Sequence, residues 1–407
     1  MVSGMDFERY RIELAQALAG TEAPFPAEEF RGRRRQVIRR MEDRGLDALL
    51  LTDPSDIYYL TGYNTFEVSV HTCLVFRPGH CLLQVPSIET GPAVTTALAD
   101  EISGYRWEAP ETLLQPLCDS LSGCRRVGID GWTPFLRQRV YTELVTRLGT
   151  DCLQEAGDVL DDVRIIKTDA ELDCLRRSAA ITARGLAAAE ELIEPGVREN
   201  AVAAAGARAM LAAGSEFMSM QPIVTSGPRI SVIHLNHTER AVRPGEAVFL
   251  EFGAACRRYT APMMRTVVAG TADQRLQRLH ASCQSVYQAL LDTMRPGTPF
   301  DEAAAAAERA LAPVADEVFF SGVFGYSVGA QFPPSWVEGT GYIARGQARR
   351  FAAGMVFHLP LCLRVPGETG LGMSDTVLVR DDGAVALSAN DWILREQEPR
   401  RDADAGS

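Results

Sequence analysis

Hydrophobic positions change their period several times within the first 160 residues, which predicts a small α/β domain. The stretch RRRQVIRRMEDRGLDALLLTD has apolar residues at helical spacing, then a glycine and a short apolar run, so it predicts a helix, a turn and a strand. CLVFRPGHCLLQVP has two apolar runs around a Pro-Gly pair, which is typical of a β-hairpin, and RRVGIDG supplies another strand. We therefore expect an N-terminal extension over residues 1–28 and an α/β domain over 29–163.

A longer helical pattern begins near residue 164. Thr168 and Glu171 have the spacing of a capping box, and the apolar residues that follow predict a long helix ending at Pro195 and Gly196, with an alanine-rich helix after it. The same order of helix, Pro-Gly and helix returns about a hundred residues later, and a strand-rich segment follows each copy. This repeat predicts a pseudo-symmetric α+β domain over 164–395, with helices outside and a curved sheet holding a site between its halves. Residues 396–407 form a tail.

Charge and cysteine usage narrow the class of protein. The chain has 53 acidic and 41 basic residues and a formal net charge of -12, which disfavours a nucleic-acid or anionic-membrane partner. The basic run RGRRR, at 31–35, is interpreted as a solvated helix face. Nine cysteines without a C-x-x-C pair favour reduced thiols over disulfides or a cysteine zinc site. No signal peptide or apolar run of about 18 residues is evident, so we expect a cytoplasmic protein.

Four polar residues occur in apolar, strand-like surroundings of the second domain. They are His234 in ISVIHLNHTER, Glu251 in VFLEFG, Tyr326 in FGYSVG and His358 in GMVFHLPL. A buried carboxylate without a partner costs several kcal/mol, so Glu251 must be paired, hydrogen-bonded or protonated. Arg265 and the histidines are available partners. Each residue taken singly also fits a satisfied core position, and Glu251 with Arg265 also fits a buried structural ion pair.

From about residue 29 to 390 the chain resembles the creatinase, prolidase and methionine-aminopeptidase superfamily. The matching segments are DPSDIYYLTGYNTF, VRIIKTDAELDCLRRSAAIT, VTSGPRISVIHLNHTERAVRPGEAVFLEFGA, YTAPMMRTV, GMVFHL and GLGMSDTVLVRDDG. The resemblance implies an α+β pita-bread catalytic domain with a pseudo-two-fold repeat, preceded by a smaller creatinase-type α/β N-terminal domain.

The peptidases of this superfamily bind two divalent metal ions through two aspartates, a histidine and two glutamates. Laid on that pattern, this chain differs at every ligand position. The residues found there are Glu251, Pro262, Tyr326, Leu359 or Pro360, and Ser374. The resemblance is therefore to the metal-free branch, most of all to ectoine hydrolases, and it implies neither a metal nor another cofactor. The segment FHLPLCLRVPGETG differs from that branch in its proline placement and its loop.

Metal-free hydrolysis of a C–N bond needs a nucleophile or activated water, a proton donor and stabilisation of the tetrahedral centre. Glu251 can act as general base or as carboxylate nucleophile. His234, which stands at the position of the creatinase histidine, is expected to carry a proton to the leaving nitrogen. Tyr326 and His358 can donate hydrogen bonds to developing charge. Arg265 can orient Glu251 or bind a substrate carboxylate.

Further substrate contacts are expected from Tyr259 and from Trp336, which can form an apolar wall. In the resembling dimers, the N-terminal domain of one subunit covers the active site of the other. Tyr63, Phe66 and His71 are therefore candidate lid residues of a homodimer, although each also fits a packing or turn role.

Three functional classes remain open. The favoured one is a metal-independent hydrolase of a C–N bond in a small cyclic amidine or amide, such as ectoine or a related amino-acid derivative. A second is another pathway-specific hydrolase or lyase, or a decarboxylase, of an amino-acid derivative on the same scaffold, and a Xaa-Pro peptidase is less favoured. The third is a non-catalytic binding protein. Polar groups with complementary roles replace the metal ligands, which favours chemistry over loss of function.

Overall fold

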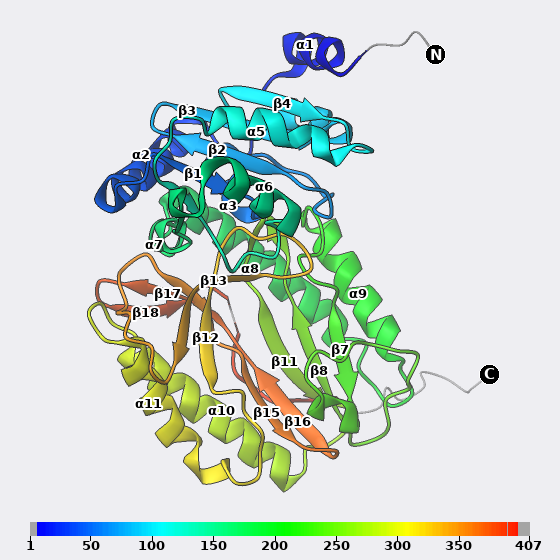
Figure 1. Ribbon diagram of the computed structural model, residues 1–407. Coiled ribbons are helices and arrows are strands. Elements are labelled where there is room, and N and C mark those ends of the chain that lie inside the picture. The colour runs from blue at the N-terminus through cyan, green and yellow to red at the C-terminus, as the bar shows by residue number, and fades with distance from the viewer. Residues whose placement is uncertain (1–5, 389, 398–407) are drawn as a thin grey trace, which may run out of the picture. The chain divides into compact units, whose positions relative to one another are not determined.

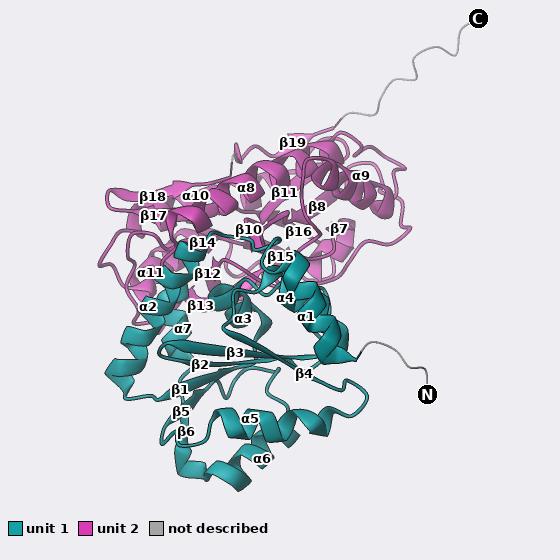
Figure 2. Cartoon of the chain, turned by 90° about the horizontal axis from the view of Figure 1, so that it is seen from above, with its two compact units in different colours: residues 1–164 teal, residues 165–407 magenta. Residues whose placement is uncertain are grey.

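The structure is a computed structural model that describes residues 6–388 and 390–397. The chain divides into two compact units, Met1–Arg164 and Ile165–Ser407 (Figure 2). No helix within the described residues is both long enough and apolar enough to cross a lipid bilayer.

Unit 1 contains a mixed six-stranded sheet in the order β4-β3-β2-β1-β5-β6 (Figure 1). Its strands are β1 (Ala48–Leu51), β2 (Cys73–Arg77), β3 (His80–Pro86), β4 (Glu101–Tyr105), β5 (Val127–Ile129) and β6 (Leu153–Glu155). Its helices are α1 (Phe7–Leu18), α2 (Ala27–Arg44), α3 (Pro54–Thr61), α4 (Thr90–Thr96), α5 (Leu114–Ser120), α6 (Gln138–Leu148) and α7 (Asp158–Arg164). Short 3₁₀ helices are η1 (Ser87–Glu89), η2 (Pro110–Leu113) and η3 (Thr150–Cys152).

The sequence pattern explains both faces of this sheet. Leu49 and Leu51 of β1 join the core beneath α2, whereas Ala48 and Leu50 join the core beneath α5 and α6. Side chains alternate along a strand, so a continuous apolar run fits a strand that is covered on both faces. The predicted hairpin is confirmed as the antiparallel pair β2–β3. The predicted helix, turn and strand are confirmed as α2, Gly45 in the left-handed region (φ 63°) and β1.

One residue of the basic run is buried, contrary to the prediction of a solvated helix face. The guanidinium of Arg33 is inaccessible to solvent and donates to Glu29 Oε1 at 3.0 Å and to the Tyr59 carbonyl at 3.1 Å. It also lies 4.5 Å from the ring centroid of Tyr59 and 4.7 Å from that of Phe25. A planar guanidinium stacks on aromatic faces while it is hydrogen-bonded at its edge, which makes burial of this charge tolerable.

Unit 2 has the pita-bread fold, in which each half pairs two helices with a sheet (Figure 1). Its helices are α8 (Asp169–Glu190), α9 (Glu199–Ala212), α10 (Gln274–Thr293) and α11 (Phe300–Leu311), with η4 (Gly227–Ser231) and η5 (Ala312–Val314). The first sheet, ordered β19-β11-β8-β7, contains β7 (Ile223–Ser226), β8 (Ala247–Phe252), β11 (Met263–Val268) and β19 (Arg395–Glu396). The second, ordered β13-β12-β14-β17-β18, contains β12 (Val323–Val328), β13 (Val337–Ala344), β14 (Val356–His358), β17 (Thr376–Arg380) and β18 (Gly383–Ala386). Two pairs complete the unit: β9 (Ala255–Cys256) with β10 (Tyr259–Thr260), and β15 (Leu361–Val365) with β16 (Thr369–Met373).

The predicted repeat corresponds to the two helix pairs. The capping box at Thr168 and Glu171 is confirmed at the start of α8. This helix ends at Glu190, and a turn then leads through Pro195 and Gly196 to α9. Apolar residues of α8 and α9 share a core with β8, and those of α10 and α11 share another with β12 and β14. Of the polar residues singled out in the sequence, Glu251, Tyr326 and His358 lie on strands of these sheets.

Candidate active site

Strand β8 directs Glu251 into a cavity because its side chains alternate between two faces. Val248, Leu250 and Phe252 pack into the core formed with α8 and α9. Phe249 and Glu251 point the other way and line a cavity of about 250 Å³. A single acid in an apolar strand therefore faces a space large enough for a small molecule, and not the packed core.

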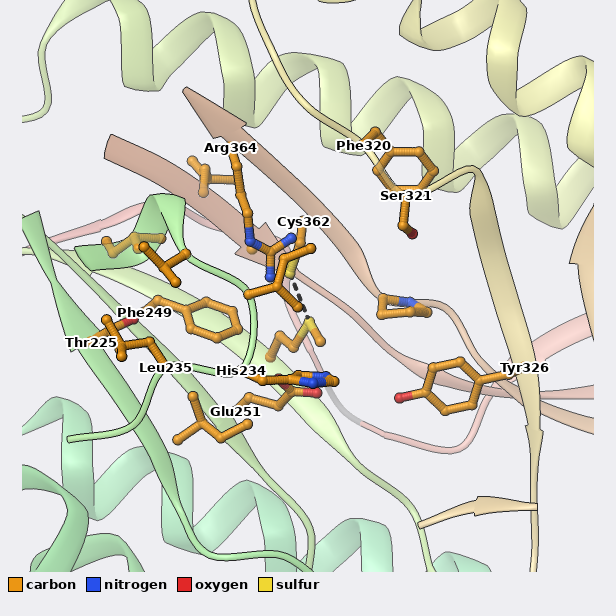
Figure 3. Close-up of a pocket in the computed structure, with 18 residues that line it drawn as sticks. Thr225, His234, Leu235, Phe249, Glu251, Phe320, Ser321, Tyr326, Cys362 and Arg364 are labelled. Atoms are coloured by element: carbon orange, nitrogen blue, oxygen red, sulfur yellow. Dashed lines mark hydrogen bonds between the residues drawn. The ribbon is translucent and has the colours of Figure 1, made fainter. Parts of the chain in front are cut away.

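The cavity combines apolar walls with a few groups capable of chemistry. Glu251, His234, Tyr326, Cys362 and Arg364 line it (Figure 3). Most of the remaining wall is apolar and comes from Ile223, Val232, Phe249, Met264, Phe320 and Leu371, among others. The lining residues belong to β7, the loop after η4, β8, β11, the segment before β12, β12 itself and the β15–β16 hairpin, so both halves of unit 2 contribute. An apolar pocket with few convergent polar groups is the usual form of a small-molecule site.

Glu251 is protonated at neutral pH in this environment. Its side chain is buried, and burial raises the pKa of the carboxyl to about 8, with partial opposition from the positive charge of Arg364. Within the part of the chain that the structure describes, its carboxyl makes no hydrogen bond or ion pair. Of the three states that the sequence allowed, protonation is the one that this environment favours.

Arg265 is not the partner of Glu251. In the β8–β11 pair, Glu251 lies opposite Met264, whose side chain lines the cavity, so the next residue, Arg265, points toward the helices. There its Nη1 contacts both carboxylate oxygens of Glu190 at 3.0 Å. The expected ion pair of Arg265 exists, but with a helix residue, and Arg265 does not line the cavity.

Tyr326 is held by a buried hydrogen-bond network. Its register across β12 and β14 places it opposite His358, and the His358 Nδ1 lies 2.8 Å from the Tyr326 hydroxyl. The His358 Nε2 lies 2.7 Å from Ser374 Oγ, which also accepts from the Met264 N–H at 2.7 Å. The indole N–H of Trp336 donates to the Tyr326 hydroxyl at 2.8 Å. Four side chains are thus connected by hydrogen bonds in series, and of these four Tyr326 lines the cavity.

The donors and acceptors of this network assign the direction of each hydrogen bond. Burial lowers the pKa of His358 to about 3, so the ring is neutral and carries one N–H. If Ser374 donates to Nε2, then Nδ1 carries the hydrogen and donates to Tyr326. The opposite tautomer leaves the Ser374 hydroxyl hydrogen without an acceptor among the described residues. The first arrangement is favoured because the hydrogen that it leaves without a protein acceptor belongs to Tyr326, which lines the cavity, whereas Ser374 is fully buried.

This assignment makes Tyr326 a hydrogen-bond donor to the cavity. Its oxygen accepts from both Trp336 and His358, which fills its two acceptor positions, so its own hydrogen is directed elsewhere. Figure 3 shows its hydroxyl pointing toward the space beside Glu251. Burial and the nearby Glu251 raise the pKa of the phenol well above its usual value, which keeps it protonated. His358 was expected to meet developing charge directly, but it does not line the cavity and acts through Tyr326.

His234 lies in a loop, contrary to its predicted place in a strand. The 3₁₀ helix η4 precedes it, and its backbone has φ 57°, in the left-handed region. The apolar run around it does not form a core strand, because Val232 and Ile233 are 51% and 42% exposed. The imidazole is exposed and lines the cavity, so a proton carrier here has access to solvent and substrate space.

Two predicted substrate contacts lie outside this cavity. The Tyr259 side chain is fully buried, and its hydroxyl donates to Glu171 Oε1 at 2.9 Å, next to the capping box of α8. Trp336 is 1% exposed and contacts Tyr326 instead of forming a wall. Neither residue lines the cavity, and Trp336 affects it only through its hydrogen bond to Tyr326.

The three candidate lid residues differ in exposure within unit 1. Tyr63 is buried and its hydroxyl donates to Glu89 Oε2 at 2.9 Å. His71 is buried, and with Tyr63 it lines a smaller cavity of about 90 Å³. Phe66 is 93% exposed, so it alone of the three presents a large apolar surface to solvent.

Sequence reasoning missed two cavity residues on β15. Cys362 Sγ lies 3.4 Å from Met264 Sδ, and burial raises the pKa of its thiol to about 12. Arg364 follows Cys362 by two residues on β15, so it lies on the same face of that strand and also lines the cavity. The signal was available, because Cys362 and Arg364 stand two residues apart in the otherwise apolar run PLCLRV, and strand alternation puts them on one face.

The residues around the cavity do not fit a two-metal centre. The described residues contain no group of three or more His, Cys, Asp or Glu side chains able to hold a metal ion together. Beside Glu251 stand a phenol and a guanidinium, and Ser374 is engaged with His358. Dinuclear hydrolases rely on several carboxylate and imidazole ligands, which this set does not supply.

Comparison with known proteins identifies the family. The description "Metallopeptidase family M24" matches residues 173–381, and "Creatinase/Prolidase N-terminal domain" matches 33–166. The chain therefore belongs to metallopeptidase family M24 and carries a creatinase-type N-terminal domain.

Individual relatives cover nearly the whole chain. An uncharacterised hydrolase/peptidase of Sinorhizobium fredii is 28% identical over 381 residues, which span 90% of this chain and 96% of that protein. The ectoine hydrolase of Halomonas elongata is 25% identical over 393 residues, with the same two coverages of 90% and 96%. Among solved structures, the dipeptidase PepE of Mycobacterium ulcerans matches with a TM-score of 0.80 at 25% identity, covering 92% of this chain and 100% of its own.

Proposed function

We propose that this M24 hydrolase opens a C–N bond in a small cyclic amidine or amide derived from an amino acid, with ectoine as the first candidate, and that no metal takes part. The observation that carries the proposal is a lone buried acid, Glu251, in a small cavity whose opposite wall presents the hydroxyl of Tyr326. The similarity to a protein named ectoine hydrolase supports the substrate class.

The raised pKa of Glu251 suits a cationic substrate. Burial alone keeps the carboxyl protonated, but an amidinium placed beside it favours the carboxylate by direct charge attraction. Binding is therefore coupled to release of the proton, and the carboxylate is generated only when substrate is present. The same ionised group can then act as base or nucleophile.

One turnover forms a C–O bond and breaks a ring C–N bond. Ionised Glu251 accepts a proton from water as the water oxygen adds to the amidine carbon, and the O–H of Tyr326 donates a hydrogen bond to that oxygen. Both protons of the water end on the departing nitrogen, and His234, at the exposed side of the cavity, is placed to carry one of them. If Glu251 adds to the carbon itself, water hydrolyses the resulting acyl-enzyme, and the net bonds and protons are the same.

A dipeptidase is the main alternative, because the solved relative is named a dipeptidase. Its family chemistry uses metal ions, for which the described side chains around this cavity offer too few ligands. The two functions therefore predict different responses to metal removal.

The test compares substrates and metal dependence in one experiment. Purified full-length protein is incubated with ectoine, creatine and a Xaa-Pro dipeptide, with and without chelator, and products are analysed by mass for addition of water. We expect water to add to ectoine, with kcat/KM rising with pH through about 8, no effect of chelator, and no turnover by Glu251→Gln. Two metal ions per subunit, with dipeptide hydrolysis lost on chelation, would overturn the proposal. Full activity of Glu251→Gln would exclude the role of Glu251.

A further inference from the structure

Arg364 is a cavity arginine without an acidic partner. Its Nε atom is buried and has no hydrogen-bond acceptor within the described residues, and no carboxylate there forms an ion pair with it. The Nε of Arg265 also lacks an acceptor within the described residues, but its Nη1 contacts the Glu190 carboxylate at 3.0 Å. A partly desolvated guanidinium that lacks such a partner loses hydration without replacement.

The charge of Arg364 is available to a ligand. Glu251 shares the cavity and is the acid whose pKa responds to Arg364, yet the two groups are not in ion-pair contact. With Glu251 protonated, Arg364, at the β15 side, is the one cation without a carboxylate partner among the described residues that line the cavity (Figure 3). Charge balance therefore favours a ligand with one anionic group at this side and a C–N centre at the other.

The strand that carries Arg364 is fixed on both sides. On one side, the Arg364 carbonyl accepts from the Phe319 N–H at 2.7 Å, and its N–H donates to the Phe319 carbonyl at 3.2 Å. On the other side, Arg364 pairs with Gly370 of β16, where a Cβ atom would lie 2.8 Å from the Ile230 side chain. The hairpin is thus packed closely on η4, and a guanidinium on a fixed backbone is pre-organised for a carboxylate.

We propose that Arg364 binds the carboxylate of the substrate and restricts the enzyme to small amidines or amides that carry one. This inference rests on the proposed function and names its substrate class more narrowly. A planar guanidinium can make two parallel hydrogen bonds to a carboxylate, which fixes orientation as well as affinity. The carboxylate then aligns the C–N centre of the same molecule with Glu251.

The test measures binding and turnover separately. Ectoine, and the same cyclic amidine without its carboxylate, are compared by calorimetric binding and by steady-state kinetics on wild type, Arg364→Gln and Arg364→Lys. Arg380→Gln is the control, because Arg380 is an exposed arginine paired with Asp382. We expect Arg364→Gln to weaken ectoine binding and raise its KM roughly 10- to 100-fold, with Lys intermediate. The cyclic amidine without the carboxylate should bind wild type and all three variants with the same low affinity.

The outcomes separate this inference from the proposed function. Binding of ectoine that depends on Arg364, without turnover, would contradict the proposed function and support the carboxylate site. Turnover of ectoine that is unchanged in Arg364→Gln would contradict the carboxylate site and leave the proposed function standing. If neither ectoine, creatine nor a Xaa-Pro dipeptide binds with an affinity that depends on Arg364, the carboxylate site is overturned.

Discussion

At the residue scale, the protonation state of Glu251 bears on both the proposed chemistry and the stability of the fold. The sequence allowed its burial to be predicted, because one acid stands in an apolar alternating strand. The sequence did not specify which neighbours face it, because that depends on how strands pair. Arg265 was a reasonable partner by distance along the chain, yet register places it on the opposite face of the sheet.

The pH dependence of folding tests the protonation of Glu251. Its pKa is about 8 in the folded protein against an ordinary value of 4.5, so between these pH values the native state retains a proton that the unfolded state releases. The free energy of unfolding therefore falls as pH rises through this window. Glu251→Gln removes this pH-dependent contribution. The free energy of unfolding of the variant, relative to that of wild type, should therefore increase by on the order of 3 to 4 kcal/mol from pH 5 to pH 9.

Urea unfolding of both proteins across this pH range measures the difference. The pKa values of Asp56 and Asp375 are also raised, to about 7 and about 6, but both residues are present in wild type and variant, so their effects cancel. Parallel stability curves for the two proteins would show that Glu251 is ionised in the native state.

The network behind Tyr326 gives a second prediction at this scale. Ser374→Ala removes the donor that directs His358 toward Tyr326, so we expect kcat to fall about tenfold with little change in KM. Tyr326→Phe should lower kcat by more than Ser374→Ala does. The double variant should be no slower than Tyr326→Phe alone, since Ser374 acts only through the tyrosine hydroxyl.

Ser388→Ala is the matched control for this experiment. Its hydroxyl is also buried and donates to Asp375 Oδ1 at 2.5 Å, so the variant loses a comparable hydrogen bond outside the Tyr326 network. It should lower stability without coupling to Tyr326→Phe. Additive losses of kcat for Ser374→Ala and Tyr326→Phe would mean that the serine has a general structural role.

At the scale of elements, strand alternation explains most of what sequence reasoning achieved and missed. The hairpin, the capping box and the repeated helix pair follow from local signals and are confirmed. The segment around His234 resembled a strand because it is apolar, but its Val232 and Ile233 are largely exposed beside a cavity. The local pattern of apolar residues predicts helices and strands. It does not predict a cavity, because a cavity forms where strands distant in the sequence pair.

Close packing of β16 on β8 gives a prediction at this scale. A Cβ atom at Gly372 would lie 2.3 Å from the Phe249 ring and 3.0 Å from Cys362 Sγ. Because Phe249 lines the cavity, Gly372→Ala should push its ring into the substrate space, raising the KM for ectoine at least tenfold and lowering the melting temperature.

Gly206→Ala, in helix α9, is the control, because Gly206 packs against the opposite face of β8. A Cβ atom there would lie 2.1 Å from the ring of Phe252, which packs against α9 and away from the cavity. Gly206→Ala should lower the free energy of unfolding by about 1 to 3 kcal/mol, as should Gly372→Ala, but it should leave the KM of the folded protein unchanged. Equal KM values for the two variants would contradict the placement of Phe249 in the cavity wall.

At the scale of the whole molecule, we predict a homodimer in which each N-terminal unit completes the partner's site. Phe66 is the candidate contact, because it is a large apolar side chain that is 93% exposed in this chain. Light scattering should give twice the chain mass of 44.4 kDa. Phe66→Ser should raise KM without lowering the melting temperature of the dimer.

Mixed dimers provide the sharper measurement. Phe66→Ser lacks the covering side chain and Glu251→Gln lacks the acid, so a dimer of one of each contains one site with both intact residues if the cover comes from the partner. Subunit exchange between the two variants should then restore activity with the wild-type KM. Activity that merely equals the sum of the separate variants would place Phe66 outside the partner's site.

The Tyr326 oxygen accepts two hydrogen bonds, so its O–H is left to donate to the cavity, and this has a consequence for inhibition. In the proposed reaction, its O–H faces a substrate carbon that carries no oxygen, so the substrate offers this hydroxyl an acceptor only when water or Glu251 adds to that carbon. The interaction therefore belongs to the transition state and adds little to ground-state affinity. Stable mimics of the tetrahedral adduct, with an oxygen where ectoine has none, should be captured far more tightly than the substrate itself.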